Sequence, residues 1–155
     1  MTIDLKPGTP GWQQRHVDAY LASDGAEGHV IDFGRPGVPP VNCLLLQTTG
    51  RKSHDTKTSP LIYGEDKGGF VIVASRGGAP THPAWFLNLR DAPEVRFQVV
   101  NKKYRGRARI TTGAERERLY QMMTGLFPPY RDYQAKTTRE IPVVVLEPQG
   151  EIEKL

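Results

Sequence analysis

The sequence predicts an α+β fold in which about six mostly antiparallel strands form one small sheet with helices at its margins. Short apolar runs alternate with turn residues along most of the chain. The 16 glycines and 13 prolines are spread over its whole length. Helical patterns separate few of the strands, so most strands follow one another without crossover helices. Closure of such a sheet into a barrel would hide its edges.

The chain is expected to form one structural domain. Its 155 residues are enough to bury a core, and 25% charged residues do not indicate disorder. Within this domain, residues 1–40 are expected to form an N-terminal helix and an irregular connection. Residues 41–155 are expected to form the barrel.

The first expected element is a helix that begins at Thr9-Pro10, runs to about Asp24 and is stopped by Gly25. One stripe of this helix carries large side chains. These are Trp12, His16, Val17, Tyr20 and Leu21. The stripe can pack on the protein core, or residues 9–24 can contact a membrane surface. Residues 25–40 are rich in glycine and proline and are expected to be irregular.

Six strands are expected in the rest of the chain, each an apolar or alternating run bounded by turn residues. They cover about 41–49, 57–64, 69–75, 94–100, 103–111 and 141–146.

Two further helices are expected. One covers about 82–91 and ends before Pro93. The other covers about 113–125, and Thr112 and Glu115 have the spacing of a capping box at its start. A loop or short helix follows Pro128-Pro129.

Charge and cysteine content restrict the partners and the compartment. The net charge of +4 suggests an anionic partner without naming one. The single cysteine, Cys43, excludes an internal disulfide and is expected to be a small buried residue in an apolar strand, which suits a reducing cytoplasm. The first 20 residues lack the apolar core of a secretory signal, and the apolar runs are too short to span a bilayer. A cytoplasmic protein is expected, peripheral at the inner membrane face if residues 9–24 bind lipid.

The segment from Ser75 to Asn88 predicts an anion site beside a flat apolar surface. A buried strand over 70–74 leads into Arg76 and two glycines. A helix start follows, with Thr81 or His82 as the cap and Pro83 in the first turn. Free N–H groups, the helix dipole and Arg76 would favour an anion there. Trp85 and Asn88 lie on one helix face and would border a ring-bearing ligand, although Trp85 can also be a core residue.

Two other cationic clusters stand out. Arg51, Lys52 and Lys57 surround one turn and could hold an anionic tail, or the turn could simply be solvated. Lys103, Arg105, Arg107 and Arg109 alternate along a strand and predict an outward face. No recognised nucleic-acid motif accompanies them, so a nucleic-acid partner is not expected.

Tyr130 and Tyr133 follow a proline break and could clamp a ring or donate a proton, or could pack within their loop. His16, His29, His54 and His82 have no metal-ligand spacing, and no nucleophile elbow is present. We therefore expect neither a metal site nor a serine triad.

Several motifs occur together in an order that resembles a known family. They are LQTTGRKS at 46–53, PL at 60–61, ASRGGAPTHPAWFLNL at 74–89, PPY at 128–130 with YQ at 133–134, and REIPVVVLEP at 139–148. The series resembles the actinobacterial deazaflavin-dependent nitroreductase family, whose members include quinone reductases. The resemblance covers about residues 41–148.

This resemblance implies a split β-barrel, related to flavin reductases, that binds coenzyme F420. The coenzyme carries a deazaflavin ring, a ribityl phosphate, a lactyl group and an oligoglutamate tail. The implied activity is hydride transfer from the reduced coenzyme to a quinone or nitroaromatic acceptor. The resemblance also implies a homodimer as one form of assembly.

The resemblance assigns roles to individual residues. Arg51, Lys52 and Ser53 would hold the phosphate or tail, and Ser75 and Arg76 would close the site. Tyr130 would face the ring and the substrate and is the preferred proton donor, with Ser75 as the other hydrogen-bond donor, while Tyr133 would shape the acceptor pocket. The remaining coenzyme contacts would be Lys57, Thr58, Ser59, Pro60, Leu61 and Ile62 along one strand, and Ala84, Trp85, Phe86, Leu87 and Asn88 beside the deazaflavin.

Two positions depart from the family pattern, and two other functions remain open. Ile62 and Phe127 stand where members can carry tyrosine, so a hydrogen bond to a bulky nitroaromatic drug would be lost. An FMN-dependent reductase on the same barrel is an alternative, because FMN also carries a phosphate. A non-catalytic cofactor carrier or membrane-surface module is another.

Overall fold

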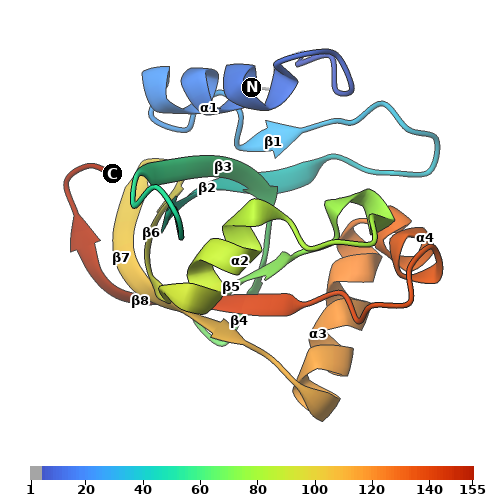
Figure 1. Cartoon of the computed structure of the whole chain (residues 1–155). Helices are drawn as coiled ribbons and strands as arrows, with labels where there is room; N and C mark the ends of the chain where they lie inside the picture. The colour runs from blue at the N-terminus through green and yellow to red at the C-terminus, as the bar shows by residue number, and fades with distance from the viewer. Residues whose placement is uncertain (1–4) are drawn as a thin grey trace.

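Antiparallel pairing joins all the strands of a curled sheet, which forms a split β-barrel with helices packed around it (Figure 1). The computed structural model describes residues 5–155; residues 1–4, the start of the expected N-terminal segment, lie outside the described residues. The spatial order is β1-β2-β6-β7-β8-β5-β4, and β3 pairs with β2. The strands are β1 (Val30–Ile31), β2 (Val41–Thr49), β3 (Thr56–Ile62), β4 (Gly64–Asp66), β5 (Gly69–Val73), β6 (Glu94–Val99), β7 (Lys102–Ile110) and β8 (Val143–Ile152).

The helices lie at the margins of the sheet, as the sequence predicted (Figure 1). They are α1 (Trp12–Ala22), α2 (Ala84–Asp91), α3 (Gly113–Leu126) and α4 (Pro129–Ala135), with a 3-10 turn η1 (Arg76–Gly78). The α+β class and the barrel are thereby confirmed.

The described sheet has eight strands where six were expected. β1 lies in the connection expected to be irregular, and two residues are too few to show a period. The strand expected over 57–64 is divided at Tyr63, because β3 pairs with β2 whereas β4 pairs with β5. β8 continues well past Leu146 because it stays paired with β7, through a register shift between Arg105 and Gly106.

The expected helix caps were wrong in two places. Pro83 is the N-cap of α2, and residues 79–83 separate the glycines from that helix. The glycine turn therefore does not lead directly into the helix N-terminus. Thr112 is the N-cap of α3 but forms no side-chain cap bond, and Glu115 instead accepts a hydrogen bond from Arg109 Nη1 at 2.6 Å.

Both faces of β5 are buried, which explains its unbroken apolar sequence. Phe70 and Ile72 face the barrel interior with residues of β2, β6 and β8. Val71 and Val73 face the opposite side, which α3 and α4 cover. The start of α4 is therefore packed against the same sheet that carries Ser75 at the end of β5.

Helix α1 lies against the barrel (Figure 1), and its buried residues His16, Val17 and Tyr20 face the protein interior. Val17 and Tyr20 are 5% and 0% exposed, and Tyr20 Oη donates to the Cys43 carbonyl at 3.1 Å. Leu21, 48% exposed, is the exception on the expected stripe. None of the helices within residues 5–155 has both the length and the apolar character needed to cross a membrane.

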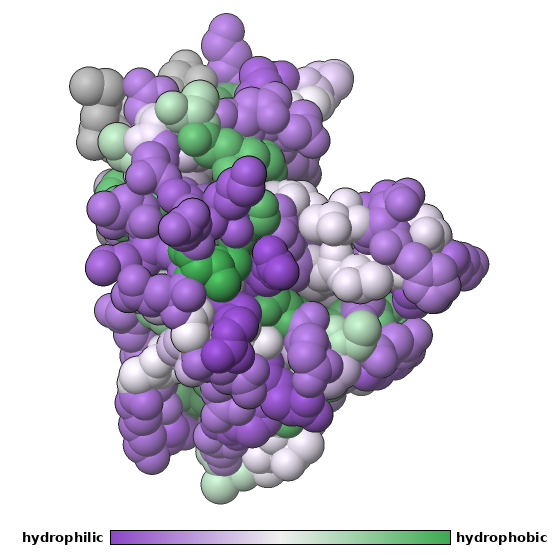
Figure 2. Space-filling model, turned by 90° about the vertical axis from the view of Figure 1, so that its left-hand side faces the viewer, coloured by the Kyte–Doolittle hydropathy of each residue, from purple (hydrophilic) through white to green (hydrophobic). Residues whose placement is uncertain are grey.

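The side of the molecule that carries β6 and β7 is largely hydrophilic (Figure 2). On β7, Lys103 pairs with Asp24, Arg107 with Glu94 and Arg109 with Glu115, each at 2.6 Å. The predicted outward cationic face is confirmed, and much of its charge is matched by acidic neighbours.

Candidate active site

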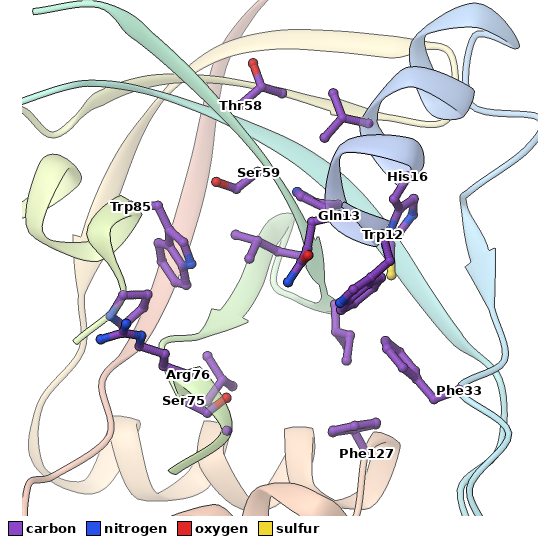
Figure 3. Close-up of a pocket in the computed structure, with 18 of the residues that line it drawn as sticks. Trp12, Gln13, His16, Phe33, Thr58, Ser59, Ser75, Arg76, Trp85 and Phe127 are labelled. Atoms are coloured by element: carbon purple, nitrogen blue, oxygen red, sulfur yellow. The ribbon is translucent and has the colours of Figure 1, made fainter. Parts of the chain in front are cut away.

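Two neighbouring cavities beside β3 form the candidate active site, and Figure 3 shows the first of them. The first, which we call the apolar cavity, has a volume of about 410 Å³ and lies between α1, β3, η1 and α4. The second, which we call the cationic groove, has a volume of about 730 Å³ and lies between α1, the turn at 50–57 and α2. The two cavities adjoin, because they share the lining residues Gln14, Val17, Thr58, Ser59 and Trp85.

The cationic groove contains the turn between β2 and β3. Arg51, Lys52, Ser53 and Lys57 line it together. The turn is closed by hydrogen bonds from Gly50 N to the Asp55 carbonyl at 2.7 Å and from His54 N to the Gly50 carbonyl at 2.9 Å. None of the ion pairs within residues 5–155 involves these cations. Their charge is therefore available to an anionic ligand.

Asn88 anchors this turn to α2. It is 5% exposed, its Oδ1 accepts from Arg51 N at 3.1 Å, and its Nδ2 donates to Thr48 Oγ1 at 3.2 Å. Asn88 lines the groove, but its amide is already used within the protein. Its position makes the placement of the cations depend on α2.

Trp85 lies at the boundary of the two cavities, half-buried on the first turn of α2 (Figure 3). Ala84 is beside it in the groove. Phe86 is buried against His82, with ring centroids 4.8 Å apart, and Leu87 packs on the barrel cluster. Helical periodicity therefore turns Phe86 and Leu87 away from both cavities, contrary to their expected place in the site.

The segment after β5 forms one wall of the apolar cavity. Ser75, Arg76 and Gly77 line it, and Arg76 Nη1 donates to Thr81 Oγ1. Arg139, which the sequence did not single out as a site residue, holds this wall from behind. Its guanidinium donates to the carbonyls of Ser75 at 2.7 Å, Ala79 at 2.9 Å and Ala74 at 3.2 Å.

Tyr130 and Tyr133 enter the apolar cavity from α4. The hydroxyl of Tyr130 forms none of the hydrogen bonds found within residues 5–155, and burial raises its pKa well above the usual value. Tyr133 Oη instead accepts from Arg35 Nη1 at 2.9 Å. Tyr130 is therefore a protonated phenol open to a ligand, whereas Tyr133 is already held.

Strand β3 forms a wall shared by the apolar cavity and the cationic groove. Thr58 and Ser59 face the junction with the groove, and Pro60, Leu61 and Ile62 line the apolar cavity. These residues, expected along one strand, therefore line one edge of the two cavities. The cavity also contains Phe127, which packs on Tyr130 with centroids 5.0 Å apart.

The wall on the N-terminal side was not predicted. Trp12, Gln13 and His16 of α1 and Phe33 of the following connection line the apolar cavity, as does Cys43 of β2 (Figure 3). The stripe of large residues on α1 was the available signal, but a stripe of this kind does not show which part of the protein it faces. Burial raises the pKa of the Cys43 thiol to about 12, so it is a protonated wall residue.

Comparison with known proteins gives one family. The family model for F420H(2)-dependent quinone reductase matches residues 12–148. The F420H(2)-dependent quinone reductase of Mycobacterium tuberculosis strain H37Rv is 38% identical over 147 residues, which cover 87% of this chain and 95% of that protein.

Solved structures agree with this result. An F420-H2 dependent reductase is 40% identical, with a TM-score of 0.63 over 68% of this chain and 93% of that one. HutZ, a heme storage protein from Vibrio cholerae, is 14% identical with a TM-score of 0.56 over 71% of this chain and 84% of that one, and shows the shared fold alone. The resemblance noted in the motifs is confirmed, and this chain belongs to the F420H(2)-dependent quinone reductase family.

Proposed function

We propose that the apolar cavity holds the deazaflavin ring and a quinone acceptor while the cationic groove holds the coenzyme's anionic tail. The protein's function is then hydride transfer from reduced coenzyme F420 to the quinone. The observation that supports this most is that an aromatic-lined cavity adjoins a groove whose cations form none of the ion pairs found within residues 5–155. A flat ring with a long acidic tail needs both parts.

The residues present fit the coenzyme. Arg51, Lys52 and Lys57 provide charge-assisted hydrogen bonds to phosphate or carboxylate groups, and Ser53 adds a hydroxyl. Trp85 borders the point where the ring would pass into the tail. When bound, the reduced deazaflavin supplies a hydride from its C5. The contribution of this chain is to hold, orient and desolvate the reactants.

Tyr130 and Ser75 are the groups that would face charge developing on the acceptor oxygen. The Tyr130 phenol keeps its proton because burial raises its pKa, so it can act as a hydrogen-bond donor and proton source. Ser75 is 8% exposed and is fixed through its carbonyl by Arg139. Tyr133, held by Arg35, would form part of the acceptor wall. Arg76 would close the site beside it.

The groove also favours coenzyme F420 over FMN. FMN carries a single phosphate group, whereas the groove presents Arg51, Lys52 and Lys57 to the ligand. Calorimetric titration of the purified protein with oxidised coenzyme F420 and, separately, with FMN should give binding of the first at least tenfold tighter. Equal affinity, or tighter binding of FMN, would support the flavin alternative.

The reaction itself can be tested with menadione as the quinone. Purified protein is mixed with reduced coenzyme F420 and menadione, and oxidation of the coenzyme is followed by its absorbance. We expect a rate proportional to protein concentration. A rate equal to that of the protein-free mixture would remove the proposed activity.

Assembly and location are further parts of the proposal. A structural neighbour 34% identical to this chain, with a TM-score of 0.65 over 86% of this chain and 96% of that one, is described as a domain-swapped dimer. It supports a homodimer here, which light scattering would detect as about twice the 17.3 kDa mass. Because α1 turns its buried side chains inward, only its exposed Leu21 supports membrane contact. We keep the cytoplasm as the proposed compartment, since Cys43 is a free thiol.

A further inference from the structure

The N-terminal part of the chain builds an aromatic wall on the apolar cavity. Trp12 of α1 meets Phe33 edge to face, with ring centroids 6.0 Å apart. Phe33 in turn lies 5.6 Å from Phe127, which follows α3. The wall therefore runs from α1 to the tyrosines of α4, and it closes the side of the cavity away from Trp85 (Figure 3).

This wall is held in place by contacts behind it. His16 Nε2 and the Gly28 carbonyl are 2.7 Å apart in a buried hydrogen bond, which ties α1 to the connection. Arg35 in the same connection donates to Tyr133 Oη at 2.9 Å. Val17 and Tyr20 anchor the helix on the barrel. The position of the wall is thus set by the fold.

Gln13 is an exposed polar residue on this side of the cavity. Gln13 lines the apolar cavity, and its amide forms none of the hydrogen bonds found within residues 5–155, whereas the neighbouring Gln14 amide donates to Asp18 Oδ1 at 2.9 Å. In Figure 3 Gln13 projects from α1 toward the middle of the cavity, and Ser75 lies across from it. Tyr130 also lines the cavity, with a free hydroxyl.

We infer that Gln13, Trp12 and Phe33 form an acceptor subsite that selects flat, uncharged rings with oxygen atoms on opposite edges. Gln13 donates to one carbonyl oxygen of a para-quinone, and Ser75 or Tyr130 donates to the other. An ortho-quinone has both oxygens on one edge, so when they face Ser75 and Tyr130 no oxygen is left for Gln13. This inference rests on the proposed function, and it adds the residues that distinguish opposed from adjacent carbonyl groups.

The test compares two acceptors with the same ring system. Menadione has opposed carbonyls, whereas 1,2-naphthoquinone has adjacent ones. We expect Gln13→Leu to lower kcat/KM for menadione about fivefold, the effect of losing one neutral hydrogen bond, and to change the value for 1,2-naphthoquinone by less than twofold. The affinity for oxidised coenzyme F420, measured by fluorescence titration, should stay the same.

Gln149→Leu is the matched control, because Gln149 is exposed on β8 and lines neither cavity. It should leave the menadione to 1,2-naphthoquinone ratio unaltered. Trp12→Phe tests the wall separately, and it should raise KM for both quinones about two- to threefold at unchanged melting temperature.

The outcomes separate the two proposals. An unaltered acceptor ratio in an active Gln13→Leu variant would overturn the subsite. Weaker coenzyme binding by that variant would also overturn it, by assigning Gln13 to the coenzyme. If the wild type reduces neither quinone faster than the protein-free mixture, the proposed function itself fails.

Discussion

Lys52 stands on an exposed turn, and the ion pairs formed within residues 5–155 do not include it. Such a side chain contributes little to the stability of the free protein, so its contribution should appear on ligand binding. We expect Lys52→Ala to raise the dissociation constant for coenzyme F420 about tenfold, equivalent to about 1.4 kcal/mol, and to leave the melting temperature in place.

Calorimetric titration checks this expectation, and Lys154→Ala is the control, because Lys154 is exposed and lines neither cavity. The effect should shrink as salt rises, since screening weakens exposed charges. Equal affinity of Lys52→Ala and wild type would remove Lys52 from the tail site.

Tyr130 combines burial with a free hydroxyl. Because that hydroxyl has no partner within the described chain, Tyr130→Phe should barely change stability. It should lower kcat with menadione on the order of a hundredfold, the effect of losing one donor to developing charge.

Burial raises the pKa of Tyr130, so the phenol stays protonated and the ratio of wild-type to Tyr130→Phe rates should be constant between about pH 6 and 9. The steady-state pH profiles of both enzymes give this ratio. If Tyr130→Phe were as fast as the wild type, another group would have to donate the proton to the acceptor.

At the scale of elements, the approach of η1 to α4 requires a glycine. Gly78 has φ +84°, and a Cβ there would lie 2.8 Å from the Tyr133 carbonyl oxygen. We expect Gly78→Ala to lower the free energy of unfolding by about 2–3 kcal/mol, through left-handed strain and this clash. It should also reduce activity, because η1 and Tyr133 both line the apolar cavity, where we propose that the acceptor binds.

Gly77→Ala separates the two causes. Gly77 also has positive φ, at +63°, but nothing lies within 4 Å of an added Cβ. In this variant the free energy of unfolding should fall by only about 1 kcal/mol. Urea unfolding of both variants tests the comparison, and equal losses would show that the contact with α4 is not tight.

The contact between α1 and its connection depends on pH through His16. Burial lowers the pKa of His16 below 6.5, so the unfolded chain binds this proton more readily than the folded one. The contribution of His16 is therefore complete above about pH 6.5 and is lost as pH falls below it.

Gln carries an amide donor near the position of Nε2 but does not titrate. His16→Gln should therefore lose less stability than the wild type between pH 6.5 and 5. The urea concentration at the midpoint of unfolding, measured at several pH values, tests this prediction. Parallel curves for wild type and His16→Gln would contradict the assignment.

At the scale of the whole molecule, the sequence predicted what local patterns determine. An apolar run identified β2 and alternation identified β7, and glycine with clustered cations identified the turn of the cationic groove. The family motifs placed β3, the Ser75 segment and Tyr130 around one site. The coenzyme expected for this protein was inferred from the same family motifs.

The rest depends on contacts between distant segments, which local patterns do not contain. β1 and β4 are short, and they form strands because they pair with β2 and β5, respectively. Thr112 is the N-cap of α3 as expected, but the capping box is not formed, because Glu115 pairs with Arg109 instead. The wall formed by Trp12, Gln13 and Phe33 follows from the docking of α1 on the barrel. Arg139 holds the segment after β5 by donating hydrogen bonds to three backbone carbonyls.

The central claim is that one continuous site holds a flat ring in the apolar cavity and an acidic tail in the cationic groove. The most direct test is the melting temperature of the full chain with saturating oxidised coenzyme F420. Binding to the folded state alone at about a hundred times the dissociation constant should raise it by about 5 °C or more, with a smaller rise in Lys52→Ala. A melting temperature that stays the same with and without the coenzyme would contradict the account.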